Sequence, residues 1–100
     1  MIEENKERYR RIRGAILKLL AHQHPGPLHV REIHFLLDDL LFTISNHELD
    51  SHLSYLEEKG FVISEERKSG GLEARMIRIT ANGLNILDQF NDDIGVDTRF

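Results

Sequence analysis

The patterning of apolar residues changes from helical to strand-like at Gly60 and changes back at Thr80. Between these positions lie two short runs rich in β-forming residues, 61–64 and 76–79, separated by a segment whose glycine pair begins at Gly70. Adjacent glycines permit the positive φ angles of a tight return, so the two runs are expected to form a β-hairpin. A chain with this feature has helices on both sides of one small antiparallel unit.

Four helices are expected, three before the hairpin and one after it. The first ends at the break around Pro25 and the second covers about 30–41. Ser45 followed by Glu48 has the spacing of a capping box, which predicts a third helix that starts near Asn46 and ends at Gly60. The apolar stripes expected to face the core are Tyr9, Ile12, Ile16, Leu19 and Leu20; Ile33, Leu36, Leu37, Leu40 and Leu41; Leu49, Leu53 and Leu56; and Leu84, Ile86, Leu87 and Phe90.

The length of 100 residues fits one domain with a single hydrophobic core. Hydrophobic residues make up 40% of the chain and charged residues 30%, which is typical of a globular protein. We expect a folded domain over 1–90 and an acidic, loosely held tail over 91–100. No stretch approaches the roughly 20 apolar residues that cross a membrane, and no secretion signal is present, so a cytoplasmic protein is expected.

Charge is distributed unevenly along the chain, although the net value is only −4. Residues 1–20 contain six basic and three acidic side chains, whereas 21–66 contain two basic and nine acidic ones. Residues 67–79 are again basic and 80–100 are acidic. Two basic segments therefore flank an acidic middle, which limits where a polyanion could be held.

The order of three helices, a hairpin and a closing helix is that of a winged helix-turn-helix fold, mainly α with a small β-hairpin. The second and third helices, joined by a short connection at 42–44, would form the helix-turn-helix unit. The first three helices would form the core, the two-stranded hairpin would form the wing, and the closing C-terminal helix would be a fourth helix after the wing.

Two motifs resemble those of MarR, ArsR and PadR type transcription regulators. The stretch LSYLEEKGFV at 53–62 resembles the junction of recognition helix and strand, and ITANG at 79–83 resembles the entry to the helix after the wing. The stretch 79–96 is also similar to small winged-helix proteins of Mu-like prophages. The resemblance implies a transcription regulator that binds double-stranded DNA, with its third helix in the major groove and its wing on the backbone.

The side of the third helix opposite its leucines is the expected DNA-reading face. It has polar side chains that can hydrogen-bond to bases, but Asp50, Glu57 and Glu58 would repel phosphates. The alternative function is a protein-interaction module of a phage or regulatory assembly, whose acidic third helix meets a basic partner. The expected DNA-contacting residues are Asn46, His47, Ser51, Ser54 and Tyr55 on this helix and Arg67, Lys68 and Arg75 on or beside the wing.

A homodimer is expected, because regulators of this type usually pair two half-sites on DNA. MarR proteins dimerise through long terminal helices, and this chain has only a short fourth helix. Tyr9, Phe35 and Phe42 are the candidate interface residues, since the two phenylalanines lie seven apart and project away from the apolar face of the second helix. The alternative is that the first or fourth helix covers these two phenylalanines within the fold.

No cofactor, metal or catalytic site is predicted. The six histidines have no i, i+4 pair, the chain has no cysteine, and no phosphate-binding glycine loop or nucleophile motif is present. These absences favour a binding protein over an enzyme.

Overall fold

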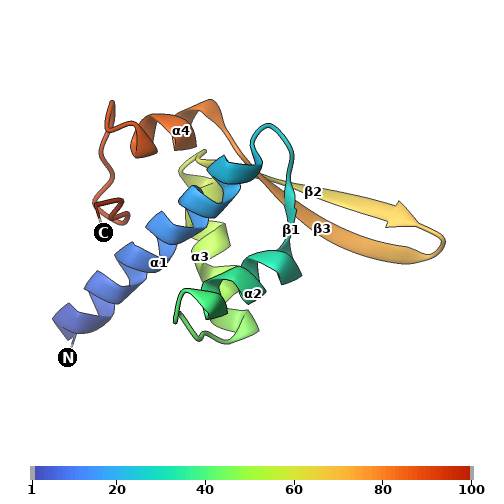
Figure 1. Cartoon of the computed structure of the whole chain (residues 1–100), viewed down its shortest axis with the longest axis horizontal. Coiled ribbons are helices and arrows are strands. Elements are labelled where there is room, and N and C mark those ends of the chain that lie inside the picture. Colours follow the sequence, from blue (N-terminus) through green and yellow to red (C-terminus); the bar gives the residue numbers. More distant parts are fainter. Residues whose placement is uncertain (1, 100) are drawn as a thin grey trace.

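Helix α1 (Ile2–Gln23) is the longest element of the computed structural model, which describes residues 2–99. The other helices pack against it, and the hairpin projects away from them (Figure 1). The remaining elements are β1 (Leu28–His29), α2 (Val30–Asp39), α3 (Asn46–Glu58), β2 (Val62–Ser69), β3 (Leu72–Ile79) and α4 (Ala81–Leu87).

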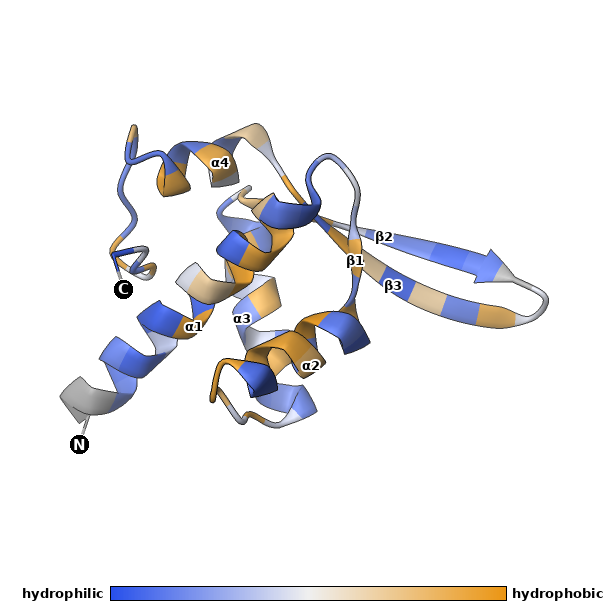
Figure 2. Cartoon of the chain, viewed as in Figure 1, coloured by the Kyte–Doolittle hydropathy of each residue, from blue (hydrophilic) through white to orange (hydrophobic). Residues whose placement is uncertain are grey.

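The core is built from the apolar stripes of the helices together with the base of the hairpin. Ile12, Ile16 and Leu20 of α1 are fully buried and belong to one core cluster with residues of the neighbouring helices. Hydrophobic and hydrophilic positions alternate along these helices (Figure 2). The helical periodicity is therefore explained by burial of one face of each helix. The buried residues that complete this core include Ile33, Leu37, Leu49, Leu53, Leu56, Val62, Ile77, Ile79 and Ile86.

Helix α2 ends at Asp39, earlier than the sequence predicts. Leu41 has a φ of 68°, and the Phe42 amide donates to the Leu37 carbonyl at 2.9 Å, which is the reversal of a Schellman motif. The chain therefore leaves the helix before Leu40 and Leu41, and both are exposed, Leu41 by 90%. The expectation that these two leucines face the core was wrong, and Phe42 does not lie on the helix.

Helix α3 starts at Asn46, as predicted, with Ser45 as its cap. The Ser45 hydroxyl accepts from the Glu48 amide at 3.0 Å. The Glu48 carboxylate does not complete the expected capping box at Ser45, because it lies 3.1 Å from both Arg8 and His52. A capping box is present at α2 instead: His29 Nδ1 accepts from the Arg31 amide at 2.9 Å, and the Glu32 carboxylate accepts from the His29 amide at 3.1 Å.

The hairpin is confirmed and is longer than predicted. Its strands pair antiparallel from Val62 opposite Ile79 to Ser69 opposite Leu72, and the turn has positive φ at Gly70 and Gly71. Strand β1, which the sequence did not predict, adds to the other edge of β3, so the sheet order is β1-β3-β2.

The segment after α4 packs against α1 and α3 rather than lying loose. Val96 is buried, the Asp97 amide donates to the Arg10 carbonyl at 3.0 Å, and the Arg10 guanidinium donates to the Ile94 carbonyl at 2.9 Å. The expectation of a loosely held tail was therefore wrong. Phe90 follows the end of α4 and is 76% exposed, so its predicted place in the core was also wrong.

No helix within the part that the structure describes is both long and apolar enough to cross a membrane.

Candidate nucleic-acid interface

The solvent face of α3 carries four of the predicted DNA-contacting residues. Asn46, His47, Ser51 and Ser54 are all exposed there, opposite the buried leucines. This periodicity follows from the helix geometry, because the leucines turn one side of α3 toward α1 and leave the polar side in solvent. A shallow depression of about 490 Å³ runs along this face and includes His47, Ser51 and Ser54 in its lining.

Arg75 joins the hairpin to α3. Its guanidinium nitrogens lie 3.2 Å from Asp50 Oδ1 and 3.9 Å from Glu57 Oε1, and one of them donates to the Ser64 hydroxyl at 3.4 Å. Arg75 is thus held beside the predicted reading face, but its charge is already shared with two carboxylates of α3. The sequence predicted its position near the wing and not this ion-pair network.

The acidity of α3 is partly balanced within the fold. Asp50 and Glu57 pair with Arg75, and the Glu48 carboxylate pairs with Arg8 at 3.1 Å. The repulsion of phosphates expected from Asp50 and Glu57 is therefore reduced by a neighbouring cation. Glu58, which is exposed, remains as a carboxylate on the reading side.

Arg67 and Lys68 lie on β2 close to the turn of the hairpin. Arg67 is 3.9 Å from Glu65, and Lys68 is 3.5 Å from Glu73 on the opposite strand. Exposed ion pairs of this kind contribute about 0 to 1 kcal/mol. Both cations are exposed and can exchange these partners for phosphate oxygens at little cost.

Tyr55 lies at the edge of α3 and contacts the C-terminal segment. Its hydroxyl donates to the Asp93 carboxylate, and the Arg13 guanidinium lies 3.9 Å from its ring centroid. Burial, followed by the hydrogen bond to Asp93, raises the pKa of Tyr55 above its ordinary value. Tyr55 is therefore tied into the fold, unlike the exposed residues near the start of α3.

His52 is a buried polar residue that the sequence analysis did not single out. It is only 2% exposed, and its ring nitrogens contact Arg13 Nε and the Glu48 carboxylate, each at 3.1 Å. Burial lowers its pKa below the ordinary value. Its place between Leu49 and Leu56 in the apolar stripe was the signal that could have identified it.

The three candidate interface residues lie in different surroundings. Tyr9 packs edge-on against His52 with 5.3 Å between ring centroids, and it lies at the margin of the core rather than fully within it. Phe42 is half-buried against the core, so the expectation that it projects outward beside Phe35 was wrong. Phe35 is 71% exposed on α2.

Metal ligands are not clustered within residues 2–99: no three histidine, cysteine, aspartate or glutamate side chains are grouped there in a way that could hold an ion.

Comparison with known proteins places this architecture among transcription regulators. No protein-family model and no curated protein matches the sequence. A proposed transcriptional regulator from Thermoplasma acidophilum has a TM-score of 0.65 and 26% identity, over 78% of this chain and 72% of that one.

Two further solved structures are similar at lower identity. A PadR family transcriptional regulator from Eggerthella lenta has a TM-score of 0.62 and 23% identity, over 75% of this chain and 66% of that one. Bacillus subtilis PadR, solved in complex with operator DNA, has a TM-score of 0.64 and 23% identity, over 78% of this chain and 46% of that one. The chain therefore spans under half of that protein. The winged helix-turn-helix fold is confirmed, with PadR-family regulators among its structural neighbours.

Proposed function

We propose that the chain is a DNA-binding transcription regulator of the winged-helix type, which acts in the cytoplasm as a homodimer. The observation that carries this proposal is the exposed polar face of α3 together with a hairpin that projects from the helices (Figure 1) and has basic residues near its tip. The same fold occurs in Bacillus subtilis PadR, which was solved with operator DNA.

Sequence reading is assigned to the exposed start of α3. The Asn46 amide can pair with two atoms of adenine, and the hydroxyl of Ser51 and the imidazole of His47 can each donate or accept one hydrogen bond. These residues have short side chains, so α3 must enter the major groove deeply for them to reach base edges.

Affinity is assigned to the hairpin. Arg67 and Lys68 are exposed cations on a strand that projects beyond the helices, where they can reach a phosphate backbone on either side of the groove. Their weak intramolecular ion pairs favour this role, because the exchange of a glutamate for a phosphate costs little.

The salt dependence of DNA binding tests this assignment. In gel-shift titrations at two salt concentrations, Arg67→Ala and Lys68→Ala are expected to weaken binding to all sequences alike. Each lost phosphate contact lowers the slope of log affinity against log salt by about one unit. Arg11→Ala, which removes an exposed arginine of α1, is the matched control and leaves the slope unchanged.

Substitutions on α3 act differently. His47→Ala and Ser51→Ala are expected to change which sequences are preferred and to leave the salt slope intact, because base contacts release no counterions.

Absence of wild-type binding at about 50 mM salt, where the electrostatic contribution is strong, would refute the DNA-binding proposal. The alternative of a protein-interaction module, in which α3 meets a basic partner, would then replace it. The resemblance to prophage proteins bears on the choice between DNA binding and protein interaction. Phage structural genes beside the coding sequence would favour the protein-interaction role.

A further inference from the structure

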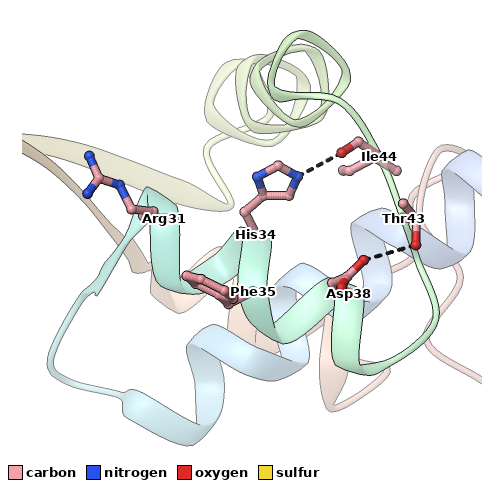
Figure 3. A pocket seen from close by; sticks show the side chains of 6 residues that line it. All are labelled: Arg31, His34, Phe35, Asp38, Thr43 and Ile44. Carbon is pink, nitrogen blue, oxygen red and sulfur yellow. Dashed lines mark hydrogen bonds between the residues drawn. The ribbon is translucent and has the colours of Figure 1, made fainter.

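One side of α2 carries an exposed stripe that the core does not use. Arg31, His34, Phe35 and Asp38 are spaced at i, i+3, i+4 and i+7 and share this side (Figure 3). Phe35 stands near the middle of the stripe, with a cation at one end and a carboxylate at the other. The Phe35 ring is 71% exposed, so its apolar surface is available for burial by a partner.

A hollow of about 350 Å³ lies directly beside Phe35. Its walls are held in place, because His34 Nε2 lies 2.7 Å from the Ile44 carbonyl oxygen and the Thr43 hydroxyl donates to Asp38 at 2.9 Å (Figure 3). A second hollow of about 290 Å³ lies toward the start of α2 and is also bordered by Phe35 and Arg31. The surface therefore contains both a projecting aromatic ring and open hollows that could receive one.

The two charges are placed unfavourably for α2 itself. Arg31 lies in the first turn, near the positive end of the helix dipole, and Asp38 lies in the last turn, near the negative end. Each charge would be favourable beside the opposite end of a neighbouring helix that runs antiparallel.

We propose that α2 pairs with α2 of a second copy of this chain, antiparallel about a two-fold axis beside His34 and Phe35. Arg31 of each copy then faces the partner's Asp38, because the midpoint of these positions falls between 34 and 35. The charges are about 10 Å apart along each helix, so both reciprocal pairs form in one register. Each Phe35 ring enters the hollow of the other copy.

The surface favours a second copy over other occupants because it is self-complementary. A two-fold interface requires that one patch hold both halves of every contact, and this stripe holds a ring with a hollow and a cation with an anion. A ten-residue helix such as α2 is about 15 Å long, so the contact is small and the dimer is expected to be reversible. This inference deepens the homodimer of the proposed function and does not depend on DNA binding.

Charge reversal in the absence of DNA tests the register. Sedimentation of the wild type at about 50 µM should give a species twice the 11.6 kDa of one chain. Arg31→Asp and Asp38→Arg each place like charges opposite one another in both pairs. Each is expected to raise the dimer dissociation constant by about tenfold or more, so each variant should sediment as a monomer at chain concentrations near the wild-type dissociation constant.

Mixing the two variants provides the sharper measurement. A heterodimer of Arg31→Asp with Asp38→Arg restores attraction at both contacts, so the mixture should sediment as a dimer although neither variant does so alone. Asp39→Arg is the matched control, since Asp39 is an exposed carboxylate of α2 outside the stripe, and it should remain dimeric. Circular dichroism of every variant establishes that the helices are intact.

Three results would overturn the proposal. The wild type could sediment only as a monomer, or both single variants could remain dimeric, which would place the interface elsewhere, for instance at the exposed Phe90 and Ile94. A mixture that stays monomeric would show that the antiparallel register is wrong. If the wild type forms this dimer but does not bind DNA, the proposed DNA-binding function is refuted and the α2 interface is unaffected.

Discussion

The two hydrogen bonds of His52 determine which of its ring nitrogens carries the proton. Arg13 Nε–H donates to Nδ1, so Nδ1 must accept, and Nε2 is left to donate to the Glu48 carboxylate. A second proton would have to displace Arg13 from Nδ1 and would place a cation beside the guanidinium. Burial and this arrangement hold His52 neutral, while Arg8 from α1 and the Tyr9 ring enclose the same site.

Stability is therefore expected to fall as the pH is lowered below the ordinary histidine pKa of 6.5. The pKa of His52 is depressed in the fold, so the unfolded chain binds more protons in this range and acid favours unfolding. Between about pH 7.5 and pH 5.5, one such group lowers the free energy of unfolding by about 1 kcal/mol. Urea denaturation at the two pH values measures this change.

His52→Gln should reduce this pH dependence, because glutamine keeps a donor and an acceptor but does not titrate. His22→Gln, at an exposed position of α1, is the control and should retain the wild-type dependence. An unchanged slope in His52→Gln would mean that other groups cause the acid sensitivity.

The glycine of the ITANG motif has a packing explanation. A Cβ at Gly83 would lie against the Phe61 carbonyl oxygen and the Ile79 side chain, so the helix after the wing can approach the sheet only with glycine there. The motif was recognised in the sequence as a family resemblance, and the structure supplies its physical reason.

The C-terminal ends of the helices could be predicted from the sequence in one case and not in two others. Three helices end in the same hydrogen-bonded reversal, with a positive φ at Leu41, Gly60 and Gln89. Only the α3 reversal uses glycine, and only that end was predicted correctly. Apolar periodicity continues past the other two reversals, which is why Leu40, Leu41 and Phe90 were wrongly expected in the core.

Long-range contacts also escaped prediction. The two-residue strand β1 has no periodicity of its own and exists because β3 offers an edge to it. On the candidate interface, the polar face of α3 follows from local spacing alone. Pairing of Arg75 with Asp50, by contrast, depends on the hairpin register and on how the hairpin meets α3.

The C-terminal segment is attached to α3 through Asp93. Its carboxylate accepts from Tyr55 and from the Gly95 amide at 3.0 Å, and it lies 3.4 Å from Lys59. Burial alone would raise the pKa of Asp93, but these three partners outweigh it and lower the pKa below its ordinary value near 3.8. The stabilisation is present above that value and is lost as the pH falls through the lowered pKa.

Asp93→Asn is expected to loosen this segment, because it removes the charge that Lys59 faces. Hydrogen exchange should become faster at the Asp97 amide, which is bonded to the Arg10 carbonyl. Partial release of buried Val96 should lower the free energy of unfolding by about 1 kcal/mol. Asp92→Asn, at the exposed neighbouring position, should change neither quantity. Equal protection of Asp97 in both variants would contradict the role of Asp93.

The hairpin and α3 are expected to present themselves to DNA as one surface. The molecule measures 44 × 29 × 23 Å, and its hairpin projects along the long direction (Figure 1). Besides the packing at its base, the hairpin is connected to α3 by Arg75 through Asp50 and Glu57. The charge that α3 shows to a phosphate backbone therefore depends on a residue of the wing.

Substitution of Arg75 and substitution of Asp50 should change DNA affinity in opposite directions. Arg75→Gln leaves two carboxylates of α3 without their cation, so non-specific binding should weaken by about fivefold, the effect of about 1 kcal/mol of repulsion. Asp50→Asn removes one negative charge and leaves Arg75 with only the more distant carboxylate of Glu57, at 3.9 Å, so binding should strengthen by a similar factor. The double variant should return close to the wild type, because it removes one positive and one negative charge and leaves the net charge of the surface unchanged. Glu58→Gln controls for the loss of a carboxylate that Arg75 does not contact, and it should strengthen binding less than Asp50→Asn. Fluorescence anisotropy with a random DNA duplex at low salt measures the affinity of all four variants. Weaker binding by Asp50→Asn would show that this carboxylate positions the wing rather than repelling DNA.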